Sequence, residues 1–532
     1  MLTATRAMIR SCRKALFRWK VADSTGDALT GGAVLTKALV LRRMLLREVL
    51  APRVEDEQYV GILLPPSNGG ALVNAAVTLA GRVSVNLNYS VTSEVLNACI
   101  RQAGIRHVLT SRKVLDKLGL EIDADVVLLE DFKDKVGTTD KAVAATLAFA
   151  TPMPVLERLL GVDRVELDDE LTVIFTSGST GEPKGVVLTH RNIMSNVIAM
   201  KEVVRLDSED VMLGVLPFFH SFGYTVTLWG PLALDIRVAY HFSPLDARQV
   251  GKLAGVRGAT ILLATPTFLR SYLKRCTKEN FATLDVVVAG AEKLPVALSD
   301  AFEEKFGVRP VEGYGATELA PLVSVNVPPS RTQTDSVDCR EGSVGQPVKD
   351  VVAKIVNPDT GEPVAAGGEG MLLISGPNLM KGYLHDPEKT AGVIQDGWYV
   401  TGDIARLDDE GFIHITGRQS RFSKIGGEMV PHLLVEEAIQ RFLAPDDEGD
   451  LVAVVTAVPD AKKGERLVVV HLPIERSPAE VCEQLASENL PNLWIPSPDA
   501  FLQVDELPLL GSGKLDLKKL AKVALDHFGA PT

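Results

Sequence analysis

The amino-acid sequence predicts an α/β protein. We expect a large N-terminal domain of layered α/β sheets, a β-rich subdomain and a small α+β C-terminal domain. From about residue 58, short apolar segments alternate with segments of helical periodicity, which is typical of layered α/β folds. Near Asp338 the chain becomes rich in Gly, Pro and close turns. A chain of 532 residues exceeds the usual domain size of about 100–200 residues, so several compact units are expected.

The N-terminal domain is predicted to cover residues 26–417, and its strands are short and apolar. Parallel strands buried on both faces have this character, and helical segments between them form the crossovers. A helix is predicted within residues 69–81. The strand candidates are segments 59–65, 107–111, 125–131, 237–242, 259–266 and 284–295.

The amino-acid composition changes within this domain at about residue 338, where Gly, Pro and turn residues become frequent. The β-rich subdomain is predicted over about 338–417, where "NPDTGEP" (357–363) is a hairpin-type turn signal. A boundary is expected between residues 417 and 421. The C-terminal domain is then predicted over 421–532, with a helix at 431–443 and strands at 451–460 and 466–473.

The composition excludes several classes of protein. A net charge of −12 argues against a general nucleic-acid binder, because phosphate binding requires a basic face. Five cysteines without a CxxC or metal-ligand spacing indicate a reducing, cytoplasmic setting. No apolar run reaches the roughly 18–20 residues of a membrane span, and no secretory signal is evident.

Residues 1–25 form a basic amphipathic segment. Arg6 to Lys20 include six Lys or Arg and no acid, and the apolar residues have helical spacing. Such a helix could lie on anionic lipid at the inner face of the cell membrane, belong to an organelle transit peptide, or pack on its own domain. The apolar segment 143–160 is interrupted by Pro152 and Pro154, which favours an interfacial or core segment over a span.

The segment "IFTSGSTGEPKGVVLTH" (174–190) has the character of a phosphate-binding loop. Glycines let backbone N–H groups approach a phosphate, hydroxyls add donors, and Lys184 supplies a positive charge. The segment is not a Walker loop, because Lys184 follows Pro183 and precedes Gly185. A flexible Gly/Ser turn is the alternative interpretation.

Four further segments occur with this loop in a fixed order. They are "EGYGATELAP" (312–321), "WYVTGD" (398–403), "ITGRQSRFSKIGGE" (415–428) and "LPLLGSGK" (507–514). Together the five segments resemble the signature of the adenylate-forming superfamily, which includes acyl-CoA synthetases, peptide-synthetase adenylation domains and luciferases. The resemblance covers nearly the whole chain from about residue 30.

The resemblance implies ATP and Mg²⁺ as cofactors and assigns roles to matching residues. Thr317 matches the α-phosphate contact, and Glu318 matches the Mg²⁺ ligand. Asp403 and Arg418 match the ribose contacts. The residues that would grip the β- and γ-phosphates are Thr176, Ser177, Gly178, Ser179, Thr180, Gly181 and Lys184. The adenine slot would comprise Gly290, Ala291, Glu292 and Tyr314.

In this superfamily, a lysine in a Gly-flanked loop near the chain end contacts the substrate carboxylate and the α-phosphate, and Lys514 matches it. One cation that contacts both anions reduces their repulsion in the transition state. The resemblance also implies a mobile C-terminal domain with its hinge at Arg421, where Asp or Lys is usual. In the thiol-transfer arrangement, Gly426, Gly427 and Glu428 would line the pantetheine tunnel.

The acid and the acceptor are predicted from a narrower resemblance. "LPFFHSFGYT" (216–225) places His220 where a ring adjoins the acyl site in acyl-activating members, and the absence of a cation there favours a fatty or aryl acid. A core histidine is the alternative. "GPNLMKGYL", "RFSKIGGEMV" and "LPLLGSGKLDL" are similar to the acyl–acyl-carrier-protein synthetase half of Aas-type bifunctional enzymes.

The predicted partners are therefore a fatty acid and holo-acyl carrier protein, with CoA as the alternative acceptor. Only about 30 residues precede the ligase region, so the acyltransferase half of that enzyme is not expected. The His241–Asp246 spacing matches the acyltransferase pair, but we interpret it as accidental. Acyl transfer to lysolipid with a separate acyltransferase subunit, and a non-catalytic acyl-AMP sensor, are further alternatives.

Overall fold

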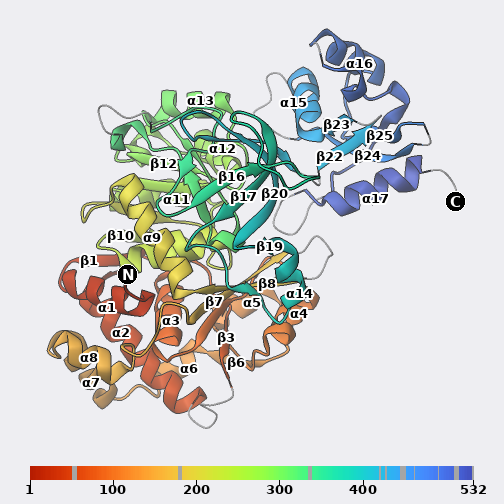
Figure 1. The fold of residues 1–532 in the computed structure, drawn as a ribbon. Coiled ribbons are helices and arrows are strands. Elements are labelled where there is room, and N and C mark those ends of the chain that lie inside the picture. The colour runs from red at the N-terminus through yellow and green to blue at the C-terminus, as the bar shows by residue number, and fades with distance from the viewer. Residues whose placement is uncertain are drawn as a thin grey trace. The chain divides into compact units, whose positions relative to one another are not determined.

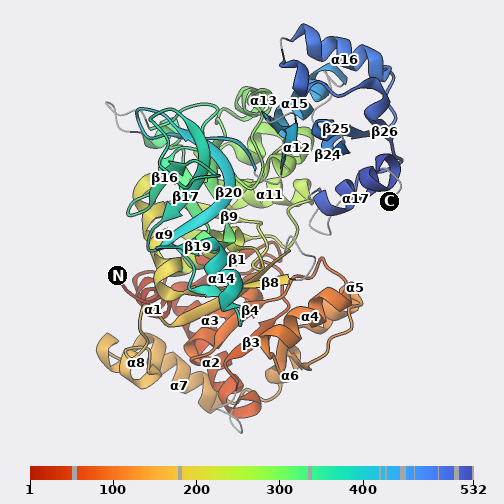
Figure 2. The same cartoon turned by 45° about the vertical axis from the view of Figure 1, so that its right-hand side comes forward.

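The computed structural model describes residues 1–50, 57–177, 183–332, 338–418, 421–425, 428–443, 451–460, 462–488, 490–508 and 515–529 (Figures 1 and 2). The chain divides into two compact units. The first comprises residues 1–354, 373–400 and 408–414, and the second comprises residues 355–372, 401–407 and 415–532. Each unit is described by itself below.

A seven-stranded sheet forms the first layer of unit 1, in the order β18–β8–β7–β4–β3–β5–β6. Most neighbours are parallel, but β8 is antiparallel to both β7 and β18. The strands are β3 (Tyr59–Ile62), β4 (Val83–Asn86), β5 (His107–Thr110), β6 (Asp125–Leu128), β7 (Glu170–Ser177), β8 (Pro183–Thr189) and β18 (Gly382–Tyr383).

A nine-stranded sheet forms the second layer, in the order β15–β14–β13–β12–β11–β9–β10–β1–β2. The strands from β13 to β1 are parallel, and antiparallel strands close both edges. The strands are β1 (Trp19–Asp23), β2 (Ala28–Thr30), β9 (Val211–Gly214), β10 (Arg237–Tyr240), β11 (Ile261–Ala264), β12 (Val286–Ala289), β13 (Val311–Gly315), β14 (Leu322–Val325) and β15 (Gln346–Pro347).

Several helices of unit 1 begin at a short polar side chain that caps them. Ser67 accepts a hydrogen bond from Gly70 N at the start of α3, and Thr189 and Asn192 form a capping box at the start of α9. The helices are α1 (Ala4–Lys14), α2 (Gly31–Met44), η1 (Leu45–Val49), α3 (Asn68–Leu79), α4 (Ser93–Ala103), α5 (Arg112–Leu118), α6 (Leu129–Lys133), α7 (Thr138–Phe149), α8 (Met153–Leu160), α9 (His190–Val204), η3 (Phe222–Trp229), α10 (Gly230–Ala233), α11 (Ala247–Arg257), α12 (Pro266–Arg275), η4 (Lys278–Phe281), α13 (Val296–Phe306), η5 (Thr317–Leu319), η6 (Pro329–Arg331) and α14 (Pro387–Val393).

The N-terminal segment packs on unit 1. Met8, Ile9 and Cys12 on α1 are fully buried, and both Arg6 and Arg10 form ion pairs with the buried Glu157 of α8. Figures 1 and 2 both show α1 beside α2, with α7 and α8 close by. Of the three interpretations of this segment, its apolar face therefore supports packing on its own domain.

A five-stranded sheet follows in the β-rich region, in the order β16–β17–β20–β19, with β21 paired to β20. Its strands are β16 (Val352–Val356), β17 (Glu369–Ser375), β19 (Ile394–Gln395), β20 (Trp398–Leu407) and β21 (Ile413–Arg418). Close turns between these strands account for the many Gly and Pro residues in this part of the sequence.

The C-terminal part of unit 2 contains a sheet in the order β23–β22–β25–β24, with β26 beside β25. Helices pack on it through apolar residues such as Val435, Ile439 and Leu520. Its strands are β22 (Phe422–Ile425), β23 (Glu428–Pro431), β24 (Ala453–Asp460), β25 (Gly464–His471) and β26 (Phe501–Gln503). Its helices are α15 (His432–Leu443), α16 (Pro478–Ser487), η8 (Asn492–Trp494), η9 (Pro498–Ala500) and α17 (Leu517–Phe528).

The predicted fold class is confirmed, with local corrections. The strand predicted at 125–131 ends at Leu128, where α6 begins. The helix expected to reach Lys20 ends at Lys14, because Trp19 and the buried Lys20 belong to β1. Segment 143–160 is divided between α7 and α8. Among the residues that the structure describes, no helix has both the length and the apolar character to cross a bilayer.

Candidate active site

The carboxyl ends of the parallel strands in the nine-stranded sheet carry several predicted site residues. β9, β11, β12 and β13 all run in the same direction, so the segments that follow them emerge at one edge. The His220 segment follows β9, Gly290 follows β12, and Thr317 follows β13. Ligands of open α/β sheets characteristically bind outside the carboxyl ends of the strands.

The Gly-rich segment connects β7 to β8, which form a hairpin. Thr176 lies opposite Lys184 in this antiparallel pair, so their side chains are on the same face. Gly185 is constrained at this point, because a Cβ atom there would lie 3.0 Å from Val173 and 3.1 Å from Leu384. This close packing of the backbone at Gly185 fixes the position of the neighbouring Lys184 Cα atom.

A late segment of the chain completes this sheet beside Lys184. Gly382 and Tyr383 form β18 and pair with Val187 and Val186 of β8. Figure 1 shows α14, which follows β18, next to β8. The preceding residues are held by Asn192, whose amide donates to Pro377 O at 2.9 Å and to Leu379 O at 2.7 Å.

Tyr383 contacts two of the predicted site residues. Its hydroxyl donates to Glu318 Oε1 at 2.9 Å, and Lys184 Nζ lies 5.3 Å from its ring centroid, a cation–π distance. Burial and the negative charge of Glu318 raise the pKa of Tyr383, so the hydroxyl remains a donor. No role was predicted for this tyrosine, which lies in the segment "GPNLMKGYL" (376–384).

A second contact joins the segments after β9 and β13. Ser221 Oγ lies 3.2 Å from Thr317 Oγ1, which places the buried Ser221 beside a predicted α-phosphate contact. His220 is exposed, with its ring centroid 4.6 Å from that of Phe219. No role was predicted for Ser221, although its position directly after His220 in the sequence could have indicated one.

The predicted adenine residues are distributed over two loops. Gly290 is buried against Phe222, whose ring would lie 3.2 Å from an added Cβ atom. Ala291 has a positive φ of 69°, and Glu292 accepts a hydrogen bond from Thr267 Oγ1 at 2.8 Å. Tyr314 lies on β13, next in the sheet to β12.

Unit 2 contains the two predicted ribose contacts. Arg418 Nε lies 2.8 Å from Asp403 Oδ1, and the carboxylate is buried whereas the guanidinium is exposed. Arg421, the predicted hinge residue, is buried and ion-paired with Glu436 of α15. Its role as a hinge stays a prediction.

Several predicted site residues lie outside the part of the chain that the structure describes. They are Gly178, Ser179, Thr180, Gly181, Gly426, Gly427 and Lys514, together with the side chains of Ser177 and Glu428.

The donor set around Glu318 suits a nucleotide-bound Mg²⁺. Within the described residues, no group of three or more Asp, Glu, His or Cys could hold a metal ion alone. Mg²⁺ is commonly held by one or two carboxylates together with substrate phosphates. A carboxylate has two acceptor oxygens, and the Tyr383 hydroxyl occupies a position at Oε1. Glu318 therefore fits the role of a single protein ligand.

The His241–Asp246 pair does not form an acyltransferase site. His241 is buried, its Nδ1 lies 2.8 Å from Ser24 Oγ, and its Nε2 lies 3.8 Å from Asp246 Oδ2. The backbone N–H groups of Ser24 and Gly26 donate to Tyr240 O and Asp23 O. An oxyanion would lack these donors, so we assign the histidine a structural role.

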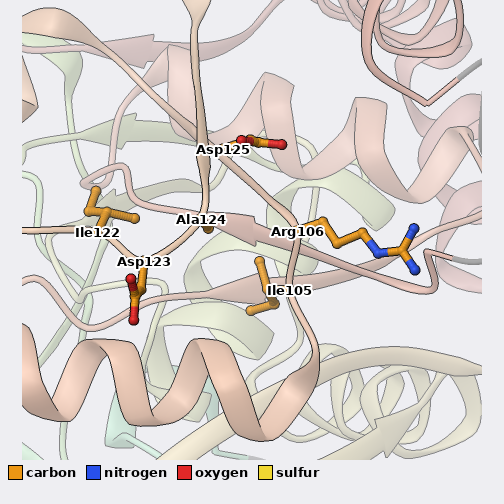
Figure 3. Close-up of a pocket in the computed structure, with 6 residues that line it drawn as sticks. All are labelled: Ile105, Arg106, Ile122, Asp123, Ala124 and Asp125. Atoms are coloured by element: carbon orange, nitrogen blue, oxygen red, sulfur yellow. The ribbon is translucent and has the colours of Figure 1, made fainter.

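A surface pocket lies at the far edge of the seven-stranded sheet. It has a volume of about 440 Å³, and Figure 3 shows the residues that line it, Ile105, Arg106, Ile122, Asp123, Ala124 and Asp125. These residues flank β5 and β6, whereas Lys184 and Tyr383 lie on β8 and β18 at the opposite edge. The pocket is therefore separate from the cluster at Tyr383.

Comparisons with known proteins show the family of this chain. Residues 13–384 match the family model described as AMP-binding enzyme. The long-chain-fatty-acid–CoA ligase of Bacillus subtilis is 28% identical over 526 residues, which cover 93% of this chain and 90% of that protein. The medium-chain-fatty-acid–CoA ligase of Ectopseudomonas oleovorans is 32% identical, with 66% and 64% covered.

The solved structures support the fold. ATP-bound MatB from Rhodopseudomonas palustris superposes with a TM-score of 0.78 at 24% identity, covering 99% of this chain and 100% of that one. A fatty acyl CoA synthetase from Mycobacterium tuberculosis gives a TM-score of 0.72 at 22% identity, with 98% of each chain covered. The chain therefore belongs to the AMP-binding enzyme family of the adenylate-forming superfamily. This family includes AMP-forming acid–thiol ligases.

Proposed function

We propose that this enzyme is a fatty acid–CoA ligase. In the first half-reaction a carboxylate oxygen attacks the α-phosphorus of ATP, the bond to the bridging oxygen breaks, and pyrophosphate leaves with the electron pair. In the second, a thiol loses its proton and attacks the acyl carbon, and AMP leaves. The observation that supports the proposal is the pair of contacts that Tyr383 makes with the carboxylate of Glu318 and with the ammonium of Lys184 on β8.

Residues of this chain are proposed to bind ATP, Mg²⁺ and the carboxylate substrate. We propose that Lys184 and the hydroxyls of the β7–β8 loop bind the β- and γ-phosphates, and that Thr317 contacts the α-phosphate. Glu318 would hold Mg²⁺, which when bound neutralises phosphate charge. Asp403 and Arg418 would bind the ribose hydroxyls. Lys514 would approach the carboxylate and the α-phosphate together, lowering the repulsion between two anions.

A fatty acid is the favoured substrate because the segment after β9 is apolar and aromatic. Phe218 and Phe219 are buried, and the Phe219 ring packs edge-to-face on Tyr89 with centroids 4.7 Å apart. In segment 216–225 the sole basic side chain is His220, whose neighbours suit an aliphatic or aryl chain more than a charged one. The two ligases named above act on fatty acids, which supports the same class.

CoA is the acceptor that the relatives favour, and acyl carrier protein is the second candidate. One observation supports a carrier protein: Lys518, Lys519 and Lys522 of α17 are exposed, and an acidic carrier would be attracted to them. A solvated helix face explains the same lysines. For either thiol, we propose that residues 426–428 line the pantetheine tunnel.

One assay tests the proposal and decides between the acceptors. The enzyme is incubated with ATP, Mg²⁺ and a panel of fatty acids, with CoA or holo-carrier protein in parallel, and thioesters are identified by mass. We expect acyl-CoA and AMP. Formation of acyl-carrier protein without acyl-CoA would favour the second candidate. ADP instead of AMP, or no cleavage with any acid, would refute the proposed chemistry.

We also propose peripheral contact with membranes, through residues other than the apolar face of α1. Phe17 is 82% exposed and Phe149 is 42% exposed, with their ring centroids 6.1 Å apart, and Lys14 is exposed nearby on α1. Exposed aromatic rings beside a basic side chain suit an anionic lipid interface. Flotation with anionic vesicles should show that Phe17→Ser binds several-fold less than the wild type. Equal flotation would refute the contact.

A further inference from the structure

We propose that Tyr383 is a positioning residue that holds the cation-binding carboxylate of Glu318 and the phosphate-binding ammonium of Lys184 in place for Mg·ATP. The inference rests on the proposed function, which gives Glu318 and Lys184 their roles. It adds a third residue to this part of the candidate site. Tyr383 lies in segment 376–384, for which the sequence predicted no residue role.

The hydroxyl of Tyr383 acts on Glu318. The tyrosine is 7% exposed and donates to Oε1 at 2.9 Å, so it fixes the rotation of the carboxylate without neutralising it. A second contact links the same segments, because Met380 N donates to Glu318 O at 2.8 Å. Both the backbone and the side chain of Glu318 are therefore tied to the residues around β18.

The ring of Tyr383 acts on Lys184. The ammonium lies 5.3 Å from the ring centroid, where the electron-rich face attracts a cation but leaves its N–H groups available to phosphate oxygens. In the described part of the chain, no ion pair joins Lys184 to Glu318. Such a pair would occupy the ammonium that ATP requires and the carboxylate that Mg²⁺ requires. Tyr383 instead gives the ammonium and the carboxylate a neutral contact.

The backbone of β18 is rigid enough for this role. Lys381 N donates to Val187 O at 3.0 Å, and Leu384 N donates to Gly185 O at 2.7 Å. Between these two bonds to β8, Tyr383 N donates to Thr390 Oγ1 at 2.9 Å. The strand is thus held from β8 on one side and from α14 on the other.

Two substitutions separate the hydroxyl from the ring. Tyr383→Phe removes the hydrogen bond to Glu318 and keeps the aromatic face, whereas Tyr383→Leu removes both. Tyr59→Phe is the matched control. Tyr59 lies in the same seven-stranded sheet as Tyr383, and its hydroxyl also donates to a glutamate, Glu170 Oε2, at 2.9 Å. Circular dichroism and thermal melting verify that each variant is folded.

The readouts are ATP binding by calorimetry, with and without Mg²⁺, and the Mg²⁺ concentration for half-maximal pyrophosphate exchange. For Tyr383→Phe we expect that Mg²⁺ concentration to rise about 10- to 100-fold, the scale of one hydrogen bond to a charged group. Its affinity for metal-free ATP should change less than twofold. For Tyr383→Leu we expect metal-free ATP to bind at least threefold more weakly as well. Tyr59→Phe should match the wild type in both.

Two results would overturn the inference. One is that both Tyr383 variants retain wild-type Mg²⁺ dependence and ATP affinity. The other is that folded Tyr59→Phe shows shifts of the same size, since the effect would then be general to the sheet. The calorimetry needs no acid or thiol. If the wild type binds Mg·ATP but forms no AMP with any acid, the proposed function fails while the role of Tyr383 is still tested.

Discussion

Asp403 and Arg418 form an ion pair in which Nε lies 2.8 Å from Oδ1. The carboxylate is 6% exposed and the guanidinium 62% exposed, so a surface arginine covers a buried acid. A buried carboxylate that is oriented in this way can accept hydrogen bonds from a pair of adjacent hydroxyls at its remaining lone pairs. The two ribose hydroxyls of ATP provide such a pair.

Replacement of this acid should therefore reduce discrimination between riboses. The wild type should use ATP better than 2′-deoxy-ATP by about 10-fold or more, the scale of one hydrogen bond to a charged group. Asp403→Asn should lower kcat/KM for ATP and bring the two nucleotides within about threefold of each other. Pyrophosphate exchange with each nucleotide measures this. An unchanged ratio in the variant would remove Asp403 from the ribose site.

Loss of the Lys184 ammonium should weaken ATP binding. We expect Lys184→Met to lower kcat/KM for ATP by about 10- to 100-fold, because charged hydrogen bonds of about 1.5–3 kcal/mol are lost. Lys381→Met is the matched control, as Lys381 pairs with Glu170 at 2.8 Å just before β18. Steady-state kinetics with ATP as the varied substrate should leave the control within about twofold of the wild type.

Lys514 should contribute mainly to the first half-reaction. We expect Lys514→Ala to slow acid-dependent pyrophosphate exchange about 100-fold or more, the effect of losing one oriented charge donor in a transition state. Thioester formation from synthetic acyl-AMP should fall much less. Near-normal exchange in this variant would contradict the assignment.

His190 should make the stability of unit 1 depend on pH. Burial lowers its pKa to about 4, and its Nδ1 accepts a hydrogen bond from Ala4 N at 3.2 Å, so the folded state holds it neutral. As the pH falls below about 6.5, the unfolded state takes up a proton that the folded state does not. Stability is then lost at up to about 1.4 kcal/mol per pH unit, until the pH reaches about 4.

The variant His190→Asn retains an acceptor but cannot be protonated in this range. Its thermal midpoint should therefore fall less between pH 7.5 and pH 5 than that of the wild type. Other groups titrate equally in the two proteins and cancel in the comparison. Parallel midpoint curves would show that His190 does not carry this dependence.

The buried pair Arg421–Glu436 should be sensitive to the loss of one partner. Glu436 Oε1 also accepts a hydrogen bond from Val455 N at 2.6 Å. Arg421→Met should destabilise the C-terminal part of unit 2 by about 3–5 kcal/mol, because it leaves a buried carboxylate uncompensated. Adding Glu436→Gln, which keeps the acceptor and removes the charge, should restore most of this. Hydrogen exchange of α15 and β24 peptides measures both variants.

Much of the fold was predictable from the sequence, because buried strands leave a local pattern. The strands near Tyr59, Ile261 and Val286 lie where apolar runs predicted them. The end of the first helix was not predictable in this way. Trp19 and Lys20 continue its basic, apolar pattern, but β1 pairs with β10 more than 200 residues later, and that tertiary contact overrides local propensity.

The sequence allowed a prediction of the candidate site where its residues lie in ordered motifs. Glu318, Thr317 and Lys184 were proposed from such motifs, and the structure shows that two other proposed residues, Asp403 and Arg418, are neighbours. The contacts between motifs were not predictable. Ser221 meets Thr317 because the segments after β9 and β13 emerge at the same edge of the nine-stranded sheet. Tyr383 on β18 of the seven-stranded sheet meets Glu318, which follows β13 of the other sheet, so this contact depends on how the two sheets pack.

The pairing of β18 with β8 also has a consequence for biosynthesis. β8 lies at residues 183–189, but the strand that borders it is formed by residues 382 and 383. A ribosome must therefore translate about 200 further codons before the nascent polypeptide can close this edge. Until then β8 lacks the strand that borders it on this side, so this part of the candidate site forms only after most of its residues have been synthesised.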